Sequence, residues 1–530
     1  MEILTSAEMR EVDRRTAEDF GVPLDALMEN AGAAVGKFCL REYATAKKVV
    51  VLAGKGNNGG DGFVTARVMA EAGKSVHVLL LGHADEVKGE AAVALARLRR
   101  EAPQVVVREI GELGDAQPAI ASAELLVDAI VGTGFKPPLR GLAAALNDAV
   151  AMASAPVVAV DLPSGWDADS KQQSMEGAYS ADAVVTFTAP KMAHMFGHLT
   201  RATLGPVVVA QIGSPSESVR SESGLHWAGG AKDIAERPRE VNANKSKYGH
   251  VLVVGGSYGT SGAPSMASLA ALRTGAGLVT AAVPRSIVDA VVAVTPELMM
   301  APLNEGPDGA VLIGDVGTVD RVIREKRITV LAIGPGLSTR GEASEFAREL
   351  VKRTTLPMVI DADALNAFAD KASELNGEGR VLVLTPHPGE MARLVGMSVK
   401  EVEADRIGLA RRFATEHKLT LVLKGWRTLI AHPDGCVAVN TTGNPAMAKG
   451  GSGDILTGII AGMLAQYAAE DAAKAIEAAV YLHGLAGDFA ARAMDEHTVL
   501  ATDTLQHLSD AFRHRVMDDA GLTWICGVHA

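Results

Sequence analysis

The feature that most constrains the fold is an alternation of short apolar runs with amphipathic stretches, repeated in two series. The first series begins at Val49 with VVVLAG and continues with VHVLLLG, LLVDAIVG, VVAVDLPSG, AVVTFTAP and PVVVAQIG. The second begins at His250 with HVLVVGGS and continues with LVTAAVP, ITVLAIGPG, LPMVIDADAL, RVLVLTPH and LTLVLKG. Runs of this kind, separated by helical segments, indicate a parallel sheet with helices on both faces. We therefore predict two α/β domains in series.

The stretch between the two series marks the expected domain boundary. Periodicity is lost beyond residue 213, where GSPSESVRSESG is polar and rich in turn-forming residues. We place the two domains at residues 1–225 and 226–530. Ahead of the first series, Thr5 and Glu8 fit a capping box that opens a helix, and a second helix is expected after Pro23. The last third of the chain is expected to be helical.

Composition narrows the class of function. A formal net charge of −12 argues against a nucleic acid or an anionic membrane as partner, but not against a phosphorylated ligand. The 3 cysteines form no CxxC pair, so a zinc ribbon is excluded and a reducing compartment is expected. The N-terminus is charged and lacks an apolar core, and no apolar run reaches the roughly 18 residues of a membrane span. We expect a cytoplasmic protein.

The sharpest motif of the first domain is GKGNNGGDG, residues 54–62, between a predicted strand and a predicted helix. Its glycines let the backbone approach a ligand and present N–H groups, and Asn57, Asn58 and Asp61 add polar groups at the strand's carboxyl end. The spacing differs from the GxGxxG dinucleotide fingerprint, which weakens a dehydrogenase interpretation. An ordinary turn would need only one or two glycines. The motif therefore predicts a ligand site.

Two carboxylates follow other strands of this domain. Asp128 precedes Gly132-Thr133-Gly134, and Asp161 ends the strand of VVAVDLPSG, so both should lie on the edge of the sheet that carries the glycine loop. A carboxylate there can act as a general acid or base, or as a cation ligand, and it can also simply cap a loop. Lys191 follows the next strand and could either supply positive charge to this pocket or be solvated.

The strongest motif of the second domain is AKGGSGD, which leads into a predicted helix. Gly450, Gly451 and Gly453 allow backbone N–H groups and the helix dipole to form an anion site, and Asp454 lies in the first turn. In phosphoryl transfer such an aspartate accepts the proton of the attacking hydroxyl. The alternative is that Asp454 is only a favourable charge at a helix N-terminus.

Other strand ends of the second domain agree with a ligand site. His387 and Glu390 follow the strand of RVLVLTPH, Lys424 and Gly425 end LTLVLKG, and Gly336 ends IGPG. A lone histidine is more often structural than catalytic, but the position of His387 on the expected substrate edge favours ligand contact. Residues 262–277 form a small-residue helix that can pack close to a ligand or a sheet.

Taken together, these motifs resemble a known family. GKGNNGGDG with DAIVGTG, DLPSGWD and TAPK resembles the NAD(P)H-hydrate epimerase domain. GGSGD with GPGLS, TPHPGE and the small-residue helix resembles the ribokinase-like, ADP-dependent NAD(P)H-hydrate dehydratase. Their order resembles the bifunctional NAD(P)H-hydrate repair enzymes. The resemblance implies a Rossmann-like α/β domain followed by a ribokinase-like α/β domain.

The resemblance also implies a substrate and the residues that act on it. The substrates would be NADHX and NADPHX, in which a hydrated nicotinamide ring carries a hydroxyl on the carbon next to its nitrogen. The first domain would interconvert the R and S epimers, and the second would phosphorylate the hydroxyl of the S form with ADP or ATP and eliminate phosphate. Asp161 and Asp454 would be the catalytic residues. A K⁺ ion would be held by Asn58, Asp128 and Ser164, and Mg²⁺ would accompany the nucleotide.

The remaining site residues are implied in the same way. The hydrate would contact Asn57, Asn58, Gly59, Gly60, Asp61, Gly132, Thr133, Gly134, Phe135, Lys136, Pro137, Pro138 and Lys191 in the first domain, and Gly336 and His387 in the second. The adenine nucleotide would contact Lys424, Gly425, Trp426, Arg427, Thr428, Gly450, Gly451 and Gly453. A homo-oligomer is expected. The main alternative is a ribokinase-like small-molecule kinase fused to a nucleotide-binding module; NNGGD disfavours it, because ordinary kinases of this fold have no use for that motif.

Overall fold

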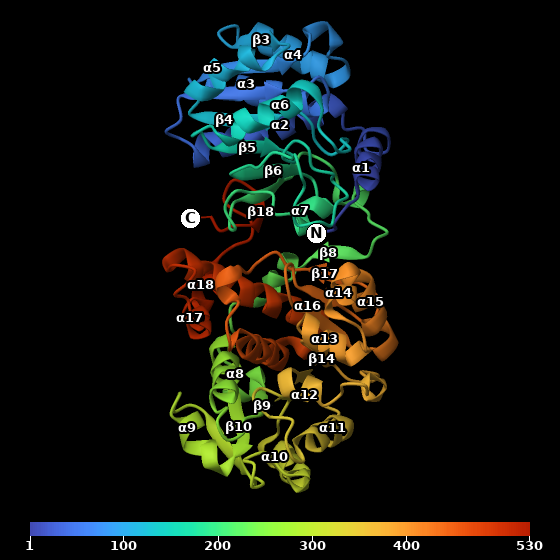
Figure 1. Cartoon of the computed structure of the whole chain (residues 1–530), viewed down its shortest axis with the longest axis vertical. Coiled ribbons are helices and arrows are strands. Elements are labelled where there is room, and N and C mark those ends of the chain that lie inside the picture. The colour runs from blue at the N-terminus through green and yellow to red at the C-terminus, as the bar shows by residue number, and fades with distance from the viewer. Residues whose placement is uncertain (530) are drawn as a thin grey trace. The chain divides into compact units, whose positions relative to one another are not determined.

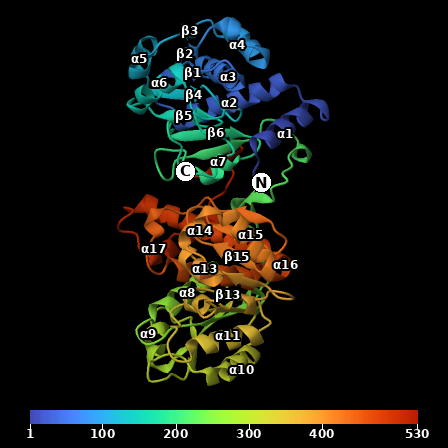
Figure 2. The same cartoon turned by 45° about the vertical axis from the view of Figure 1, so that its right-hand side comes forward.

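The computed structural model describes residues 1–529 and divides the chain into two compact units (Figures 1 and 2). The first unit consists of Met1–Ser223 together with the residues from Arg515 onward, and the second of Gly224–His514. No helix among residues 1–529 has the length and apolarity that a bilayer crossing requires.

The first unit is built on an eight-stranded sheet in the order β18-β7-β6-β5-β4-β1-β2-β3. All neighbouring strands are parallel except β18, which is antiparallel to β7. Its strands are β1 (Lys48–Ala53), β2 (Ser75–Leu81), β3 (Val106–Ile110), β4 (Leu125–Ala129), β5 (Val157–Val160), β6 (Ala183–Phe187), β7 (Val207–Ala210) and β18 (Leu522–Cys526).

Seven helices accompany this sheet. They are α1 (Ser6–Glu18), α2 (Leu24–Glu42), α3 (Asn57–Glu71), α4 (Gly89–Glu101), α5 (Leu113–Ser122), α6 (Gly141–Ala151) and α7 (Met192–Phe196). The expected capping box is present at α1, where Thr5 and Glu8 satisfy each other's backbone N–H groups. Helices α2, α3 and α4 pack together over an apolar core that includes Phe38, Phe63 and Leu98.

The end of the chain corrects the expected domain limits. We placed all residues beyond 225 in the second domain, but β18 pairs with β7 and so completes the first unit's sheet, where Figure 1 shows it in red. Trp524 of β18 is buried against Phe38, with ring centroids 6.3 Å apart. Burial of apolar surface along an otherwise open sheet edge explains why the segment returns. No local sequence pattern encodes a pairing between strands so distant in the chain.

The second unit is built on a ten-stranded sheet in the order β11-β10-β9-β12-β13-β14-β15-β16-β17-β8. The strands from β11 to β15 are parallel to their neighbours, β16 is antiparallel to both β15 and β17, and β8 is parallel to β17. They are β8 (Leu225–Trp227), β9 (His250–Val254), β10 (Leu278–Pro284), β11 (Met299–Leu303), β12 (Val330–Ile333), β13 (Met358–Ile360), β14 (Leu382–Leu384), β15 (Thr420–Leu423), β16 (Leu429–Ala431) and β17 (Val437–Val439).

Helices α8 and α16 pack on each other and on the central strands, and α15 packs on β15 and β16 (Figure 2). The unit's helices are α8 (Gly262–Thr274), α9 (Val288–Val292), α10 (Val316–Lys326), α11 (Ala343–Arg353), α12 (Ala362–Asn366), α13 (Pro388–Val395), α14 (Val399–Ala404), α15 (Arg406–His417), α16 (Ser452–Ala493), α17 (Ala501–Gln506) and α18 (Leu508–Arg513). Asp471 interrupts α16 with non-helical backbone angles. The last third of the chain, expected to be helical, is so only from α16 to α18, because β13 to β17 and β18 also lie in it.

Candidate active sites

The first site forms where the parallel strands β1, β4, β5 and β6 end. Register pairs Leu52 of β1 with Asp128 of β4, and Asp128 with Ala159 of β5, so their carboxyl ends share one edge of the sheet. Gly54 makes this possible, because a Cβ at that position would lie 2.0 Å from the carbonyl oxygen of Ile130. The expected meeting of the glycine loop with the two aspartate loops is confirmed.

Asp161 is the most constrained residue of this site. Its φ of 65° is left-handed, which is uncommon outside glycine and marks a backbone held by its surroundings. Its Oδ2 accepts hydrogen bonds from the backbone N–H of Thr133 at 2.9 Å and from the Thr133 hydroxyl at 2.5 Å. Its Oδ1 accepts one from the Thr186 hydroxyl at 2.8 Å.

Lys191 completes the environment of Asp161. Its Nζ lies 3.0 Å from Asp161 Oδ1 and donates to the Thr186 hydroxyl at 2.9 Å, and the side chain is buried. Burial alone would raise the pKa of Asp161, but the Lys191 charge and these hydrogen bonds hold that pKa well below its usual range. Asp161 is therefore a fixed negative charge. From the sequence, Lys191 could either supply positive charge to the pocket or be solvated. The structure shows it buried in the pocket.

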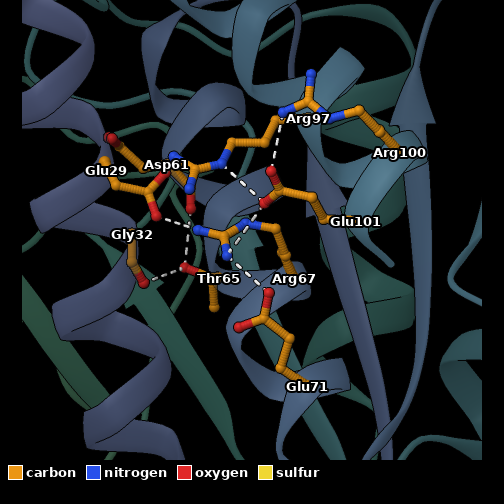
Figure 3. Close-up of polar contacts among 9 residues, drawn as sticks. All are labelled: Glu29, Gly32, Asp61, Thr65, Arg67, Glu71, Arg97, Arg100 and Glu101. Atoms are coloured by element: carbon orange, nitrogen blue, oxygen red, sulfur yellow. Dashed lines mark hydrogen bonds and ion pairs between the residues drawn. The ribbon is translucent and has the colours of Figure 1, made fainter. Parts of the chain in front are cut away.

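Helix α3 carries the NNGGD motif, and a polar network fixes it (Figure 3). Arg67 forms ion pairs with Glu29 of α2, with Glu71 at 2.7 Å and with Glu101 of α4 at 3.6 Å. The Thr65 hydroxyl donates to the carbonyl of Asp61 at 2.8 Å and to that of Gly32 on α2 at 3.0 Å. Since α2 and α4 are tied to α3 by these contacts, the network holds the helix start that presents the motif.

A cavity of about 1260 Å³ opens at this strand edge. Of the residues predicted to contact a ligand, those that line it are Asn57, Asn58, Asp61, Gly132, Thr133, Gly134, Phe135, Asp161 and Lys191. A Cβ on Gly132 would lie 2.8 Å from Asn58 Oδ1 and 3.0 Å from Asp161 Oδ2, so the glycine lets two site residues approach its backbone.

Five predicted contact residues are not among those that line the cavity. Gly59 and Gly60 are buried in packing: a Cβ on Gly59 would lie 1.9 Å from the Gly54 carbonyl oxygen, and one on Gly60 would lie 2.5 Å from Met28 Sδ. Lys136 is exposed and pairs with Asp167 at 2.7 Å and Asp169 at 2.8 Å. Pro137 and Pro138 follow it, joined by a cis peptide bond.

Asp128 and Ser164 form a buried pair beside the cavity. The Ser164 hydroxyl donates to Asp128 Oδ1 at 2.6 Å, and its backbone N–H donates to Oδ2 at 2.7 Å. Burial raises the pKa of Asp128 to about 6, and no basic side chain among residues 1–529 pairs with it. Asn58 has a buried amide nitrogen without a hydrogen-bond partner in the described part of the chain. Because amide oxygen and nitrogen are interchangeable by a flip, an oxygen could face that point instead.

Helix α1 contributes residues that the sequence did not single out. Asp13 lines the cavity, and burial together with the charge of Asp161 raises its pKa to about 6, although Lys191 acts in the opposite direction. Burial and the neighbouring Asp161 and Asp13 also raise the pKa of Asp61 well above its ordinary value. Exposed basic side chains of Arg10, Lys55 and Arg140 lie farther out along the lining.

The second site forms around the start of α16. Gly451 is left-handed at φ 97°, α16 begins at Ser452, and no side chain of the described residues caps its first turn. A Cβ on Gly453 would lie 3.2 Å from Lys424 Nζ and 3.7 Å from Asp361 Oδ2, so bare backbone faces these charged groups. The uncapped N–H groups fit the predicted anion site.

Asp454, in that first turn, has an unusual pKa. Burial, followed by the negative charges of Asp361, Asp363 and Glu390, raises the pKa to about 7 against the opposing effect of Lys424. A carboxylate with a pKa near neutrality suits proton transfer at physiological pH. A plain helix charge, the alternative interpretation of Asp454, would have no reason to be surrounded by other carboxylates.

Lys424 ties this site together. Its Nζ lies 3.1 Å from Asp361 Oδ1 and 3.8 Å from Glu390 Oε2. The Thr457 hydroxyl of α16 donates to Asp361 Oδ2 at 2.8 Å. Burial opposes the charged form, but Asp361 and Glu390 raise the pKa of Lys424. Asp361 was missed at the sequence level, although it follows the strand of LPMVIDADAL in the same way that Asp161 follows its own.

His387 and Gly336 are held by local contacts. His387 caps α13, with Nδ1 accepting the N–H of Gly389 at 3.0 Å, and its side chain is 51% exposed. Burial and the charge of Lys424 lower its pKa, which favours the neutral imidazole. Gly336 is left-handed at φ 64°, and its carbonyl accepts the Thr260 hydroxyl at 2.7 Å. Both loops follow parallel strands, β14 and β12, of the same sheet.

The KGWRT segment forms the turn between β15 and β16. Gly425 has a φ of 137°, and Arg427 has a φ of 54° and stacks over Trp426, with its guanidinium carbon 4.4 Å from the ring centroid. The Arg427 guanidinium donates to the carbonyl of Thr441, and that of Arg406 to the carbonyl of Trp426. Thr428 donates to the Gly425 carbonyl at 3.3 Å. Of the residues in this segment, Lys424 is the one whose side chain contacts carboxylates near Asp454.

Gly450, also predicted to contact the nucleotide, lies in the loop before α16.

The fold and the two sites define a two-domain α/β enzyme with a group of buried or half-buried carboxylates at the candidate site of each domain. Residues 24–193 match the family described as YjeF-related protein N-terminus, and residues 251–513 match NAD(P)H-hydrate dehydratase. The bifunctional NAD(P)H-hydrate repair enzyme Nnr of Moorella thermoacetica is 41% identical over 523 residues, covering 97% of each chain. That of Escherichia coli is 34% identical over 524 residues, covering 96% of this chain and 94% of the relative. The chain belongs to the family of bifunctional NAD(P)H-hydrate repair enzymes.

A solved relative is similar to about half of the chain. It is the ADP/ATP-dependent NAD(P)H-hydrate dehydratase of Bacillus subtilis co-crystallised with ATP and Mg²⁺, which is 32% identical, with a TM-score of 0.45, and covers 53% of this chain and 96% of its own. The fold class predicted from the sequence, two α/β domains in series, is confirmed by the two sheets, in which most neighbouring strands are parallel.

Proposed function

We propose that this chain repairs hydrated NADH and NADPH in two steps, one in each unit. The first unit interconverts the R and S epimers of the hydrate, and the second returns the S form to the reduced nucleotide at the expense of ADP or ATP. Family membership supports both reactions. One observation supports the assignment of one reaction to each site: the first site holds an ionised carboxylate, Asp161, and the second holds a carboxyl with a pKa of about 7, Asp454.

At the first site the carbon next to the ring nitrogen loses its hydroxyl and regains it on the other face. The C–O bond breaks, and the nitrogen lone pair forms a C=N⁺ bond that leaves the ring cationic. Asp161 is a fixed negative charge in a buried pocket, so it stabilises that cation. The basic side chains along the outer lining suit the substrate's phosphates. A K⁺ ion bound by Asn58, Asp128 and Ser164 would neutralise the buried Asp128.

At the second site the hydroxyl of the S form attacks the terminal phosphorus of the nucleotide. Asp454 accepts the hydroxyl proton, and the N–H groups at the start of α16 hold the transferring phosphoryl group. Phosphate then leaves with the C–O electron pair while the neighbouring carbon loses a proton, which restores the ring double bond. Gly336 and His387 would contact the hydrate. The residues at Lys424–Thr428 and Gly450–Gly453 would contact the nucleotide.

Mg²⁺ would neutralise phosphate charge during this transfer. No group of three or more His, Cys, Asp or Glu side chains within residues 1–529 is arranged to hold a metal. That fits Mg²⁺, which nucleotide enzymes bind through phosphate oxygens, waters and one or two carboxylates. Glu390, a buried carboxylate beside Lys424, would supply the protein ligand.

An assay of the products tests this function against a kinase with a stable product. The chain is incubated with the S hydrate, Mg²⁺ and ADP or ATP. Repair releases one orthophosphate for each reduced nicotinamide recovered by absorbance. Accumulation of a phosphorylated hydrate without recovery of absorbance would instead establish the kinase alternative.

A further inference from the structure

Asp13 is an acidic group of the first cavity to which the proposed chemistry gives no role. Asp13 lies on α1 and lines the cavity together with Asp61 and Asp161. Its carboxylate makes no hydrogen bond and no ion pair with any other residue in the range 1–529. A half-buried carboxylate without a structural partner is unusual, because burial of a charged group without compensation is costly. The fold thus keeps an unengaged acid inside the pocket.

Asp161 cannot easily exchange a proton with the substrate. Both of its oxygens already accept hydrogen bonds, from Thr133 on one side and from Thr186 and Lys191 on the other. Protonation would have to displace the Lys191 ion pair at 3.0 Å. Asp161 can stabilise positive charge, but departure of a hydroxyl also needs a proton donor, since hydroxide is a poor leaving group.

We propose that Asp13 is the proton-transfer residue of the epimerisation, a role that rests on the function proposed above for this unit. The Asp13 carboxyl donates its proton to the substrate hydroxyl, the C–O bond breaks with its electrons leaving as water, and the ring nitrogen forms the C=N⁺ bond. Water then attacks the opposite face of that carbon, and the Asp13 carboxylate takes one of its protons. The cycle balances without an oxidant or a second co-substrate.

The electrostatics around Asp13 agree with that role. Burial and the charge of Asp161 raise the pKa of Asp13 to about 6, with Lys191 opposing, so both protonation states are accessible near neutral pH. Asp61 of α3 also lines the cavity, and burial together with the charges of Asp161 and Asp13 raises its pKa. The other charged residues that line the cavity are Arg10, Arg14, Glu18, Lys55, Glu90 and Arg140. Arg14 forms ion pairs with Glu11 and Glu18 of the same helix.

The test is Asp13→Asn in the full chain, assayed for interconversion of R and S hydrate without nucleotide, so that the second unit is idle. Loss of a general acid lowers rates by about a hundred- to ten-thousand-fold. Because the acid form starts the cycle, the wild-type rate should fall as pH rises through about 6, and this dependence should vanish in Asp13→Asn. Asp13→Glu should recover part of the rate.

Two controls separate this role from a structural one. Glu11→Gln removes the same charge from the exposed face of the same helix and should leave the rate unchanged. Dehydration of S hydrate by Asp13→Asn should also remain normal. Wild-type-like interconversion by Asp13→Asn overturns the proposal, and so does a lower rate that keeps the fall above pH 6. If the wild-type chain does not interconvert the epimers, the proposed function fails as well.

Discussion

Replacing Asp454 with asparagine should make the second unit both less active and more stable. Asparagine keeps the shape and the start of α16, but it cannot accept the hydroxyl proton. Loss of a general base costs about a hundred- to ten-thousand-fold in turnover. Nucleotide affinity should change little, because the N–H groups of the anion site are unaltered.

The stability change follows from the pKa of Asp454. The folded pKa of about 7 lies above the ordinary value of 3.8, so above pH 7 the fold carries the cost of keeping this carboxyl ionised. A difference of about three between the two pKa values corresponds to an upper bound of about 4 kcal/mol. That cost is absent below pH 4 and grows between pH 4 and pH 7. Asp454→Asn should therefore unfold at a higher temperature than the wild-type chain at pH 8, by a smaller margin at pH 5.

The measurements are dehydration turnover with S hydrate, nucleotide affinity, and thermal unfolding of the full chain at both pH values. If Asp454 only complemented the helix dipole, its removal would cost up to about 1 kcal/mol of stability and leave turnover near normal. A less stable variant with normal turnover would therefore refute the assignment. Epimerase activity, housed in the other unit, is the internal control.

Two further predictions concern the first unit. Asp128→Ala should lower epimerisation and abolish any dependence of its rate on K⁺, measured by exchanging K⁺ for a larger organic cation; an unaltered K⁺ dependence would remove Asp128 from the cation site. Truncation after His514 should lower the melting temperature of the first unit, because the chain loses β18 with its buried Trp524. Dehydration of S hydrate should persist in that truncated chain, and its loss would show that the second unit needs the C-terminal segment.

Much of the architecture was predictable because it is local. The strands of both series, the capping box at Thr5 and the start of α16 all leave short-range patterns of apolar spacing and turn residues. The strands that we missed are those without such a pattern. In β3 the sequence VVREI is half exposed and charged, and β16 and β17 are three residues long. The return of β18 depends on a partner some 300 residues away.

In both sites, the residues that could be predicted from the sequence are those that lie directly after a strand or at the start of a helix. Asp161, Lys191, Lys424 and Asp454 stood out because they follow strands or begin a helix at a glycine loop. Asp13 did not, because helix periodicity says nothing about which surface position faces a cavity formed by distant loops. The network that holds α3 was equally hidden, since it joins three helices through long charged side chains (Figure 3).

The central claim is that one chain carries both repair activities, and purified R hydrate tests it most directly. The wild-type chain is given only the R epimer, with Mg²⁺ and ADP or ATP, and reduced nicotinamide is followed by absorbance. We predict complete recovery, because the first unit supplies S hydrate to the second. Asp161→Asn should stop recovery from the R epimer while recovery from the S epimer continues. Recovery from the R epimer at the wild-type rate in Asp161→Asn, or none in the wild-type chain, would contradict the account.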